Sequence, residues 1–192
     1  AGGQSASRPS SIKRTTELGD DGVLRFVEQP PTMTHVEPGS FGPGASRAEL
    51  FAQYRETVPL DIDTVLAQYK PTDLARRVVG VGSVGTQCFL QLLQGADGAA
   101  LLLQVKEAGE SVLARYGGMV PRDRLDQGIA LHGEGFRVVN LQRISQAVSD
   151  PFLGHLQRGE RGFTKAIDDV VQRAHTLIAL RCQEPLNLPA LA

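Results

Sequence analysis

The sequence predicts an α+β fold in which helices pack on a small, mainly antiparallel sheet around residues 78–106. Two apolar runs rich in strand-forming residues, 86–94 and 100–106, stand on either side of the turn sequence Ala-Asp-Gly at 96–98, a pattern typical of a hairpin. Helix-forming runs precede and follow this hairpin without the regular strand–helix alternation of a parallel α/β sheet. The chain has 192 residues, the length of a single domain.

The composition argues against several classes of function. A formal net charge of −1 provides no basic surface for nucleic acid or for an anionic membrane, so we expect neither partner. The polar N-terminal region contains no secretory signal, and the longest apolar run, 99–103, is too short to cross a bilayer. Cys88 and Cys182 are too few for a disulfide framework and predict reduced thiols in a cytoplasmic protein.

The N-terminal region predicts a linker followed by a short strand. Residues 1–18 begin with a stretch rich in glycine, serine and basic residues, which indicates disorder or a linker. An Asp-Gly turn then leads into an apolar run at 23–27, and the Pro30-Pro31 pair ends the predicted strand because proline lacks a backbone N–H. The glycine and proline content of 37–46 predicts a loop.

Two helices are expected between this loop and the sheet. Ser46 is a good N-cap, and Glu49 follows at the position that completes a capping box. Apolar residues at helical spacing continue from there until Pro59 ends the helix. The run 61–69 repeats the helical pattern and predicts the second helix.

Three further helices are expected after the hairpin. The segment 108–117 predicts a short helix closed by a glycine pair, and 134–148 predicts a longer one that stops before Pro151. The run 164–181 has an apolar stripe at helical spacing and predicts a last helix, followed by a frayed tail.

A glycine-rich segment directly before the hairpin is the main functional signal. Three glycines follow the β-branched pair Val78-Val79 in G-x-G-x-x-G spacing. Glycines allow several backbone N–H groups to converge on a phosphate without a clash from Cβ. The residues that would surround such a phosphate are Gly80, Gly82, Ser83, Val84 and Gly85. The spacing alone leaves three interpretations open, namely a phosphate cradle, a dinucleotide-binding turn, and a tight corner in a non-catalytic structural or interaction module.

The dinucleotide-binding (Rossmann-type) alternative needs a helix after the glycines and then a strand ending in an acid. Glu107 lies 22 residues after Gly85 (107 minus 85), close to the usual spacing. The segment 86–94 lacks a clean helical stripe, however, and no further strand–helix units follow.

The kinase-type alternative needs a glycine loop between two antiparallel strands, then a strand with a lysine for the phosphates. Lys106 meets this requirement, 26 residues after Gly80 (106 minus 80), and Glu110 on the next helix is the candidate ion-pair partner of the lysine. The structural alternative is that Lys106 lies at a strand end and extends into water.

Three blocks of sequence resemble a bacterial family catalogued as domain of unknown function 2252. The resemblance covers about residues 19–154, fades after about Gly159, and rests on DLARRVVGVGSVGTQC, LLLQVKEAGESVLARY and FRVVNLQRISQAVSDPFLG. Family members are about twice as long, and their other, upstream half has segments similar to the catalytic and metal-binding loops of aminoglycoside-type kinases. The resemblance therefore implies a kinase-like fold with rearranged order, of which this chain is a fragment or a shortened form.

Together these signals predict the nucleotide-binding portion of a kinase-like protein, inactive by itself. The expected organisation is a linker at 1–18, a domain resembling the nucleotide-binding lobe of kinases at 19–159, and a C-terminal helix and tail at 160–192. The resemblance implies ATP with Mg²⁺ as the cofactor. If the chain is half of a larger fold, an apolar face is left exposed. We expect the missing catalytic half, a second copy in a homodimer, or the helix predicted at 164–181 to cover it.

Overall fold

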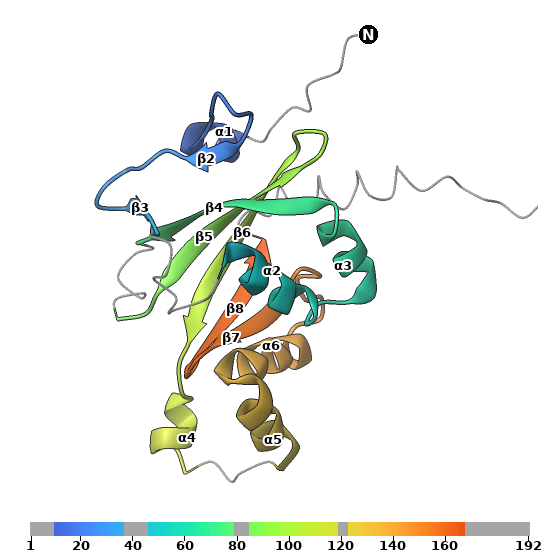
Figure 1. Ribbon diagram of the computed structural model, residues 1–192. Helices are drawn as coiled ribbons and strands as arrows, with labels where there is room; N and C mark the ends of the chain where they lie inside the picture. The colour runs from blue at the N-terminus through green and yellow to red at the C-terminus, as the bar shows by residue number, and fades with distance from the viewer. Residues whose placement is uncertain (1–9, 37–45, 79–84, 119–122, 168–192) are drawn as a thin grey trace, which may run out of the picture.

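The structure is a computed structural model that describes residues 10–36, 46–78, 85–118 and 123–167 (Figure 1). Its helices are α1 (Ser10–Thr15), α2 (Arg47–Arg55), α3 (Leu60–Leu66), α4 (Val112–Tyr116), α5 (Asp123–His132) and α6 (Glu134–Ser145). Its strands are β1 (Thr16–Leu18), β2 (Leu24–Phe26), β3 (Met33–His35), β4 (Tyr69–Arg77), β5 (Cys88–Gly95), β6 (Ala100–Ala108), β7 (Gly154–Arg158) and β8 (Arg161–Ile167).

Six of these strands form one sheet in the order β3-β4-β5-β6-β8-β7, and every neighbouring pair is antiparallel. The predicted hairpin is confirmed, since β5 pairs with β6 from Cys88 opposite Lys106 to Gln94 opposite Ala100. The α+β class with a mainly antiparallel sheet is confirmed with it. The dinucleotide-binding alternative is wrong, because a strand and not a helix follows the glycine segment and its neighbours are antiparallel.

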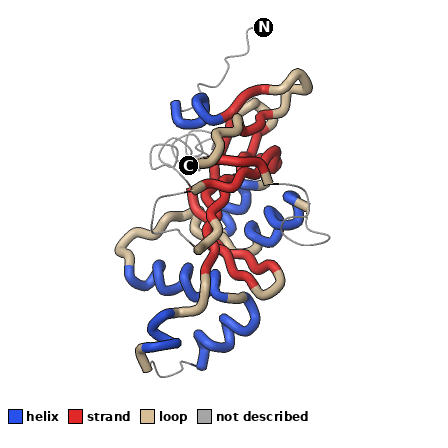
Figure 2. Tube along the Cα trace, turned by 90° about the vertical axis from the view of Figure 1, so that its left-hand side faces the viewer, coloured by secondary structure: helices blue, strands red, loops and turns tan. Residues whose placement is uncertain are grey.

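Successive residues of a strand point to opposite faces of the sheet, and different helices cover the two faces. One face, which we call the α2 face, carries Phe89, Val105 and Lys165 and packs against α2 and α3. The other, the α6 face, carries Cys88, Lys106, Thr164 and His155 in one row across four strands. Figure 2 shows α1 at one end of the sheet and α4, α5 and α6 at the other.

Helix α2 forms as its sequence predicts. The Ser46 side chain accepts a hydrogen bond from the Glu49 backbone N–H, and the Glu49 carboxylate accepts one from the Ser46 N–H. The buried Tyr54 hydroxyl donates to the carbonyl oxygen of Phe152 at 2.6 Å and so ties α2 to the segment before β7. The helix expected over 61–69 ends earlier, at Leu66, because Tyr69 already pairs with Gly95 as the first residue of β4.

The N-terminal segment differs from the expected linker. Residues Ser10–Thr15 form α1, and β1 pairs with β2 in a separate hairpin. Ile12 is fully buried with Leu24, Phe26 and sheet residues such as Leu90 in a second core cluster on the α6 face. One apolar residue in a six-residue helix is too weak a periodic signal to predict this packing from sequence.

The C-terminal part of the sheet also differs from the prediction. Residues Arg161–Ile167 form β8, which lies between β6 and β7, so the helix expected from residue 164 is wrong at its start. The remainder of that predicted helix, from 168 onward, lies outside the described residues. Gly159 has a φ of +57° and closes the tight turn between β7 and β8. The boundary expected after residue 159 would thus separate two paired strands.

Candidate functional site

The glycine segment joins β4 to β5, which are antiparallel neighbours in the sheet. Four of its predicted site residues, Gly80, Gly82, Ser83 and Val84, lie outside the described residues. Gly85 is described, is exposed, and has a φ of +92°, a conformation that glycine adopts without strain. Among the residues that the structure describes, no atom lies within 4 Å of the position that a Cβ at Gly85 would take.

Lys106 lies near the end of β6, where its exposed side chain leaves the sheet on the α6 face. Its neighbours across the sheet are Cys88 in β5 and Thr164 in β8. Because β5 begins at Cys88, Lys106 stands beside the point where the glycine segment enters the sheet. The structure therefore places Lys106 opposite Cys88, three residues after Gly85 along the chain.

Helices α5 and α6 lie on the same face of the sheet as Lys106. The His155 ring, next in the row after Thr164, is 5.6 Å from the Phe136 ring of α6 and 5.9 Å from the His132 ring of α5. Burial, and then electrostatic interaction with His132 and Arg143, lowers the pKa of His155 to about 4. His155 is consequently neutral at pH 7 and behaves as a packing residue beneath the two helices.

Two glycines bring α6 into direct backbone contact with β8. A Cβ at Gly135 would overlap the carbonyl oxygen of Phe163 and lie 3.1 Å from Cβ of His155. A Cβ at Gly162 would lie 2.6 Å from the backbone nitrogen of Gly135. This close approach, which sequence reasoning missed, fixes the start of α6 over the strand next to β6.

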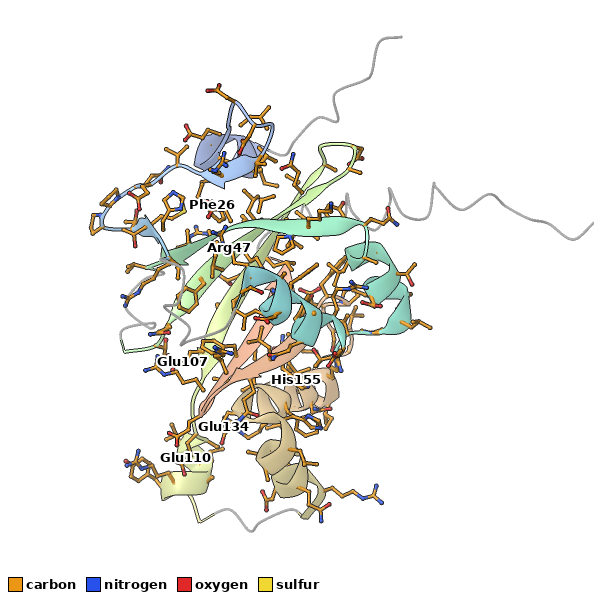
Figure 3. All side chains as sticks on the ribbon, viewed as in Figure 1. Phe26, Arg47, Glu107, Glu110, Glu134 and His155 are labelled. Carbon is orange, nitrogen blue, oxygen red and sulfur yellow. The ribbon has the colours of Figure 1, made fainter. Side chains whose placement is uncertain are left out.

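The acidic residues around the end of β6 do not pair with Lys106 in this structure. Glu110 is exposed and precedes Ser111, the N-cap of α4, so it lies before the helix that we expected it to open. Glu134 bonds instead to Arg137 at 2.5 Å, and Arg137 donates to the carbonyl oxygen of Gly109 at 2.8 Å. Figure 3 shows Glu107, Glu110 and Glu134 around the lower end of β6. Within the described ranges, no carboxylate forms an ion pair with Lys106.

Glu107 lies on the α2 face of β6, opposite in direction to Lys106. Its carboxylate accepts a hydrogen bond from the backbone N–H of Gln87 at 2.9 Å, and its own N–H donates to the Gln87 carbonyl oxygen at 2.8 Å. The other carboxylate oxygen is 3.7 Å from Nε of Arg161 in β8. Glu107 thus connects Gln87, the residue before β5, to both β6 and β8.

A second lysine, Lys165, is buried in the centre of the α2 face, and sequence reasoning missed it. Its side chain is 1% exposed and donates a hydrogen bond to the Gln91 side chain. The ammonium lies 4.5 Å from the centre of the Tyr54 ring and 5.4 Å from that of Phe51. Burial lowers the pKa of Lys165 to about 7. In the sequence, the only sign of this buried lysine is its spacing. Phe163 and Lys165 are two residues apart, so they lie on the same face of a strand.

In the ranges that the structure describes, no group of three or more histidine, cysteine, aspartate or glutamate side chains is arranged to hold a metal ion. No helix among these residues has both the length and the apolar character needed to span a membrane.

Comparison with known proteins identifies the family of the chain. Residues 3–171 match the family described as "Uncharacterized protein conserved in bacteria (DUF2252)". The match is longer than the expected 19–154 and includes β7, β8 and the N-terminal elements. No curated protein and no solved structure gave a significant match. Since the family match covers most of the sequence, the chain belongs to this bacterial family of uncharacterised proteins.

Proposed function

We propose that this chain is the nucleotide-binding portion of a kinase-like protein and that it binds the phosphates of ATP. One observation carries the proposal. The chain runs from β4 through the glycine segment to β5, then to β6 with Lys106, then through helices to β7 and β8, with every pair of neighbouring strands antiparallel. Protein kinases use a glycine-rich loop over the phosphates, a lysine on a following strand and then a helix in this order.

The chemistry of the residues fits a phosphate ligand. Lys106 offers an exposed cation opposite Cys88, and no atom of the described residues fills the space beside the Gly85 backbone. Cationic side chains and converging backbone N–H groups are the usual partners of phosphate oxygens. Mg²⁺ would accompany the nucleotide and supply positive charge that offsets the charge of its phosphates.

The lysine–glutamate pair of active kinases is not formed here, since Glu134 is bonded to Arg137 and Glu110 lies before α4. We therefore propose that a further protein unit, either the catalytic half expected from the family resemblance or a second copy, completes the site. Its contacts would reorganise the acidic residues near the end of β6.

Replacing Lys106 with alanine should weaken the binding of Mg²⁺–ATP by about tenfold or more, because a charge-assisted contact to phosphate is lost. Isothermal titration calorimetry at fixed salt measures the change. Lys70→Ala is the matched control, since Lys70 is also an exposed strand lysine but lies at the far end of β4. Equal affinity of the two variants would contradict the role given to Lys106.

The purified chain should bind nucleotide without transferring or hydrolysing the γ-phosphate. Transfer requires a positioned metal and a residue that orients the nucleophile, in addition to a glycine loop and a lysine. Release of inorganic phosphate from ATP measures the activity. Turnover above background that Lys106→Ala abolishes would show that this chain carries its own catalytic acid.

A second candidate function is a non-catalytic interaction module in which the glycines serve only as turn geometry. Helix α4 favours it, because Val112, Leu113 and Tyr116 are all largely exposed on this short helix. The calorimetric titration separates the two functions, since an interaction module would show no nucleotide binding in the unmodified chain.

A further inference from the structure

We infer that Glu107 is a positioning residue that holds Gln87, and with it the neighbouring Gly85, in place for phosphate binding. The inference rests on the proposed nucleotide-binding function and adds to it a residue on the face of β6 opposite Lys106. It concerns Gly85, Thr86 and Gln87, the described residues that lead from the glycine segment into β5.

Glu107 holds Gln87 through both its backbone and its side chain. The backbone N–H of Glu107 donates to the Gln87 carbonyl oxygen at 2.8 Å, which extends the β5–β6 pairing one residue beyond Cys88. The side-chain carboxylate then accepts the Gln87 N–H at 2.9 Å. A backbone N–H bonded to a carboxylate is held more strongly than one bonded to a neutral carbonyl group. Gln87 is therefore fixed two residues after Gly85.

The carboxylate that holds Gln87 is itself held in place. Its side chain is only 20% exposed, and the Arg161 guanidinium lies 3.7 Å from its second oxygen. On the other side of the strand end, Arg137 of α6 donates to the Gly109 carbonyl oxygen, two residues after Glu107. The end of β6 is thus bonded to both β8 and α6. These contacts restrict the movement of the strand end that holds Gln87.

The bonds between Glu107 and Gln87 connect the backbone next to Gly85 to the strand that carries the Lys106 ammonium. Glu107 and Lys106 are consecutive, so their side chains leave the strand on opposite faces while sharing one peptide unit. A phosphate group held by both the Gly85 backbone and Lys106 would require the two at a set separation. Glu107 bonds the strand that carries Lys106 to Gln87, two residues after Gly85. Because preorganised contacts bind more tightly than mobile ones, loss of the carboxylate should reduce affinity without touching the ligand.

The test compares Glu107→Ala, Glu107→Gln and Glu160→Ala with the unmodified chain by calorimetric titration of Mg²⁺–ATP well below each melting temperature. Glutamine keeps an oxygen that can accept the Gln87 N–H. Glu160 is an exposed acid in the β7–β8 turn, and its replacement makes the same change in net charge. Amide hydrogen exchange at Gln87, measured by NMR in the absence of nucleotide, reports the hydrogen bond directly.

We expect Glu107→Ala to weaken binding by about tenfold and to speed exchange at Gln87, with partial recovery in Glu107→Gln and no change in Glu160→Ala. Binding by Glu107→Ala as tight as that of the unmodified chain would overturn the inference and leave the proposed function standing. Failure of the unmodified chain to bind Mg²⁺–ATP would instead overturn the proposed function, and the inference with it.

Discussion

Replacing Lys165 with methionine should stabilise the protein at pH 7 by about 2 kcal/mol, which raises its melting temperature by roughly 4–8 °C for a chain of this size. A buried ammonium loses its hydration, and at Lys165 the compensation comes from one side-chain hydrogen bond to Gln91 and the faces of two aromatic rings. Methionine has a similar length and flexibility without the charge, so it can fill the same space beneath α2. Thermal unfolding followed by circular dichroism measures the change.

The stabilisation that Lys165→Met provides should decrease as the pH rises. Burial lowers the pKa of Lys165 from 10.5 in the unfolded chain to about 7 in the folded protein. Between these values the unfolded state binds more protons, so stability of the unmodified chain should rise with pH. Below about pH 7 both states are protonated, and the full cost of burying the charge remains. The stability difference between Lys165→Met and the unmodified chain should therefore be largest at pH 6–7 and shrink towards pH 10.

Gln91 provides the internal control. Its side chain is buried on the α2 face, and its oxygen accepts the hydrogen bond from Lys165. Gln91→Leu alone should destabilise the protein, because it leaves the buried ammonium without its acceptor. Adding Gln91→Leu to Lys165→Met should cost nothing or stabilise further. A pH-independent loss of stability in Lys165→Met would show that the lysine is not buried as the structure places it.

The same residue shows why part of the sheet could not be predicted from sequence. A lysine at the centre of a strand face breaks the apolar alternation that signals a half-buried strand, and 164–181 offered a competing helical stripe. Backbone pairing of Arg161–Ile167 with β6 and β7 makes this segment a strand and not the start of a helix. The β5–β6 hairpin and α2 were predicted correctly because their signals are local: a turn at Gly98 and a capping box at Ser46.

The positions of the candidate site residues could be predicted to a similar extent, whereas their role stays a prediction. The strand that carries Lys106 and the face to which this lysine points followed from alternation along one strand. The position of Glu110 did not follow, because Ser111 caps α4 and moves the helix start beyond the glutamate. From the sequence, Glu107 was only the candidate acid of the dinucleotide-binding alternative, since its bond to Gln87 depends on the register between two strands. The packing of α6 against β8 could not be predicted either, because it depends on contacts between residues distant in sequence.

Replacing Gly135 with alanine should destabilise the protein by about 2–3 kcal/mol, although alanine favours helix more than glycine does. The reason is steric: the new Cβ would overlap the carbonyl oxygen of Phe163, and backbone atoms of a central strand cannot move aside as a flexible side chain can. Helix α6 would have to shift away from β8. Gly109→Ala is the control, because a Cβ at Gly109 meets open space.

The displacement should also be visible at His155, which α6 covers. The ring of Phe136 lies edge-on to the His155 ring, and burial is the main cause of the low pKa of this histidine. If α6 moves away in Gly135→Ala, water reaches the ring and the pKa of His155 should rise from about 4 towards its ordinary value of 6.5. NMR titration of the histidine ring protons measures it. A folded variant with an unchanged melting temperature and an unchanged His155 pKa would mean that α6 does not lie against β8. In that case the helix would not cover the face from which Lys106 projects.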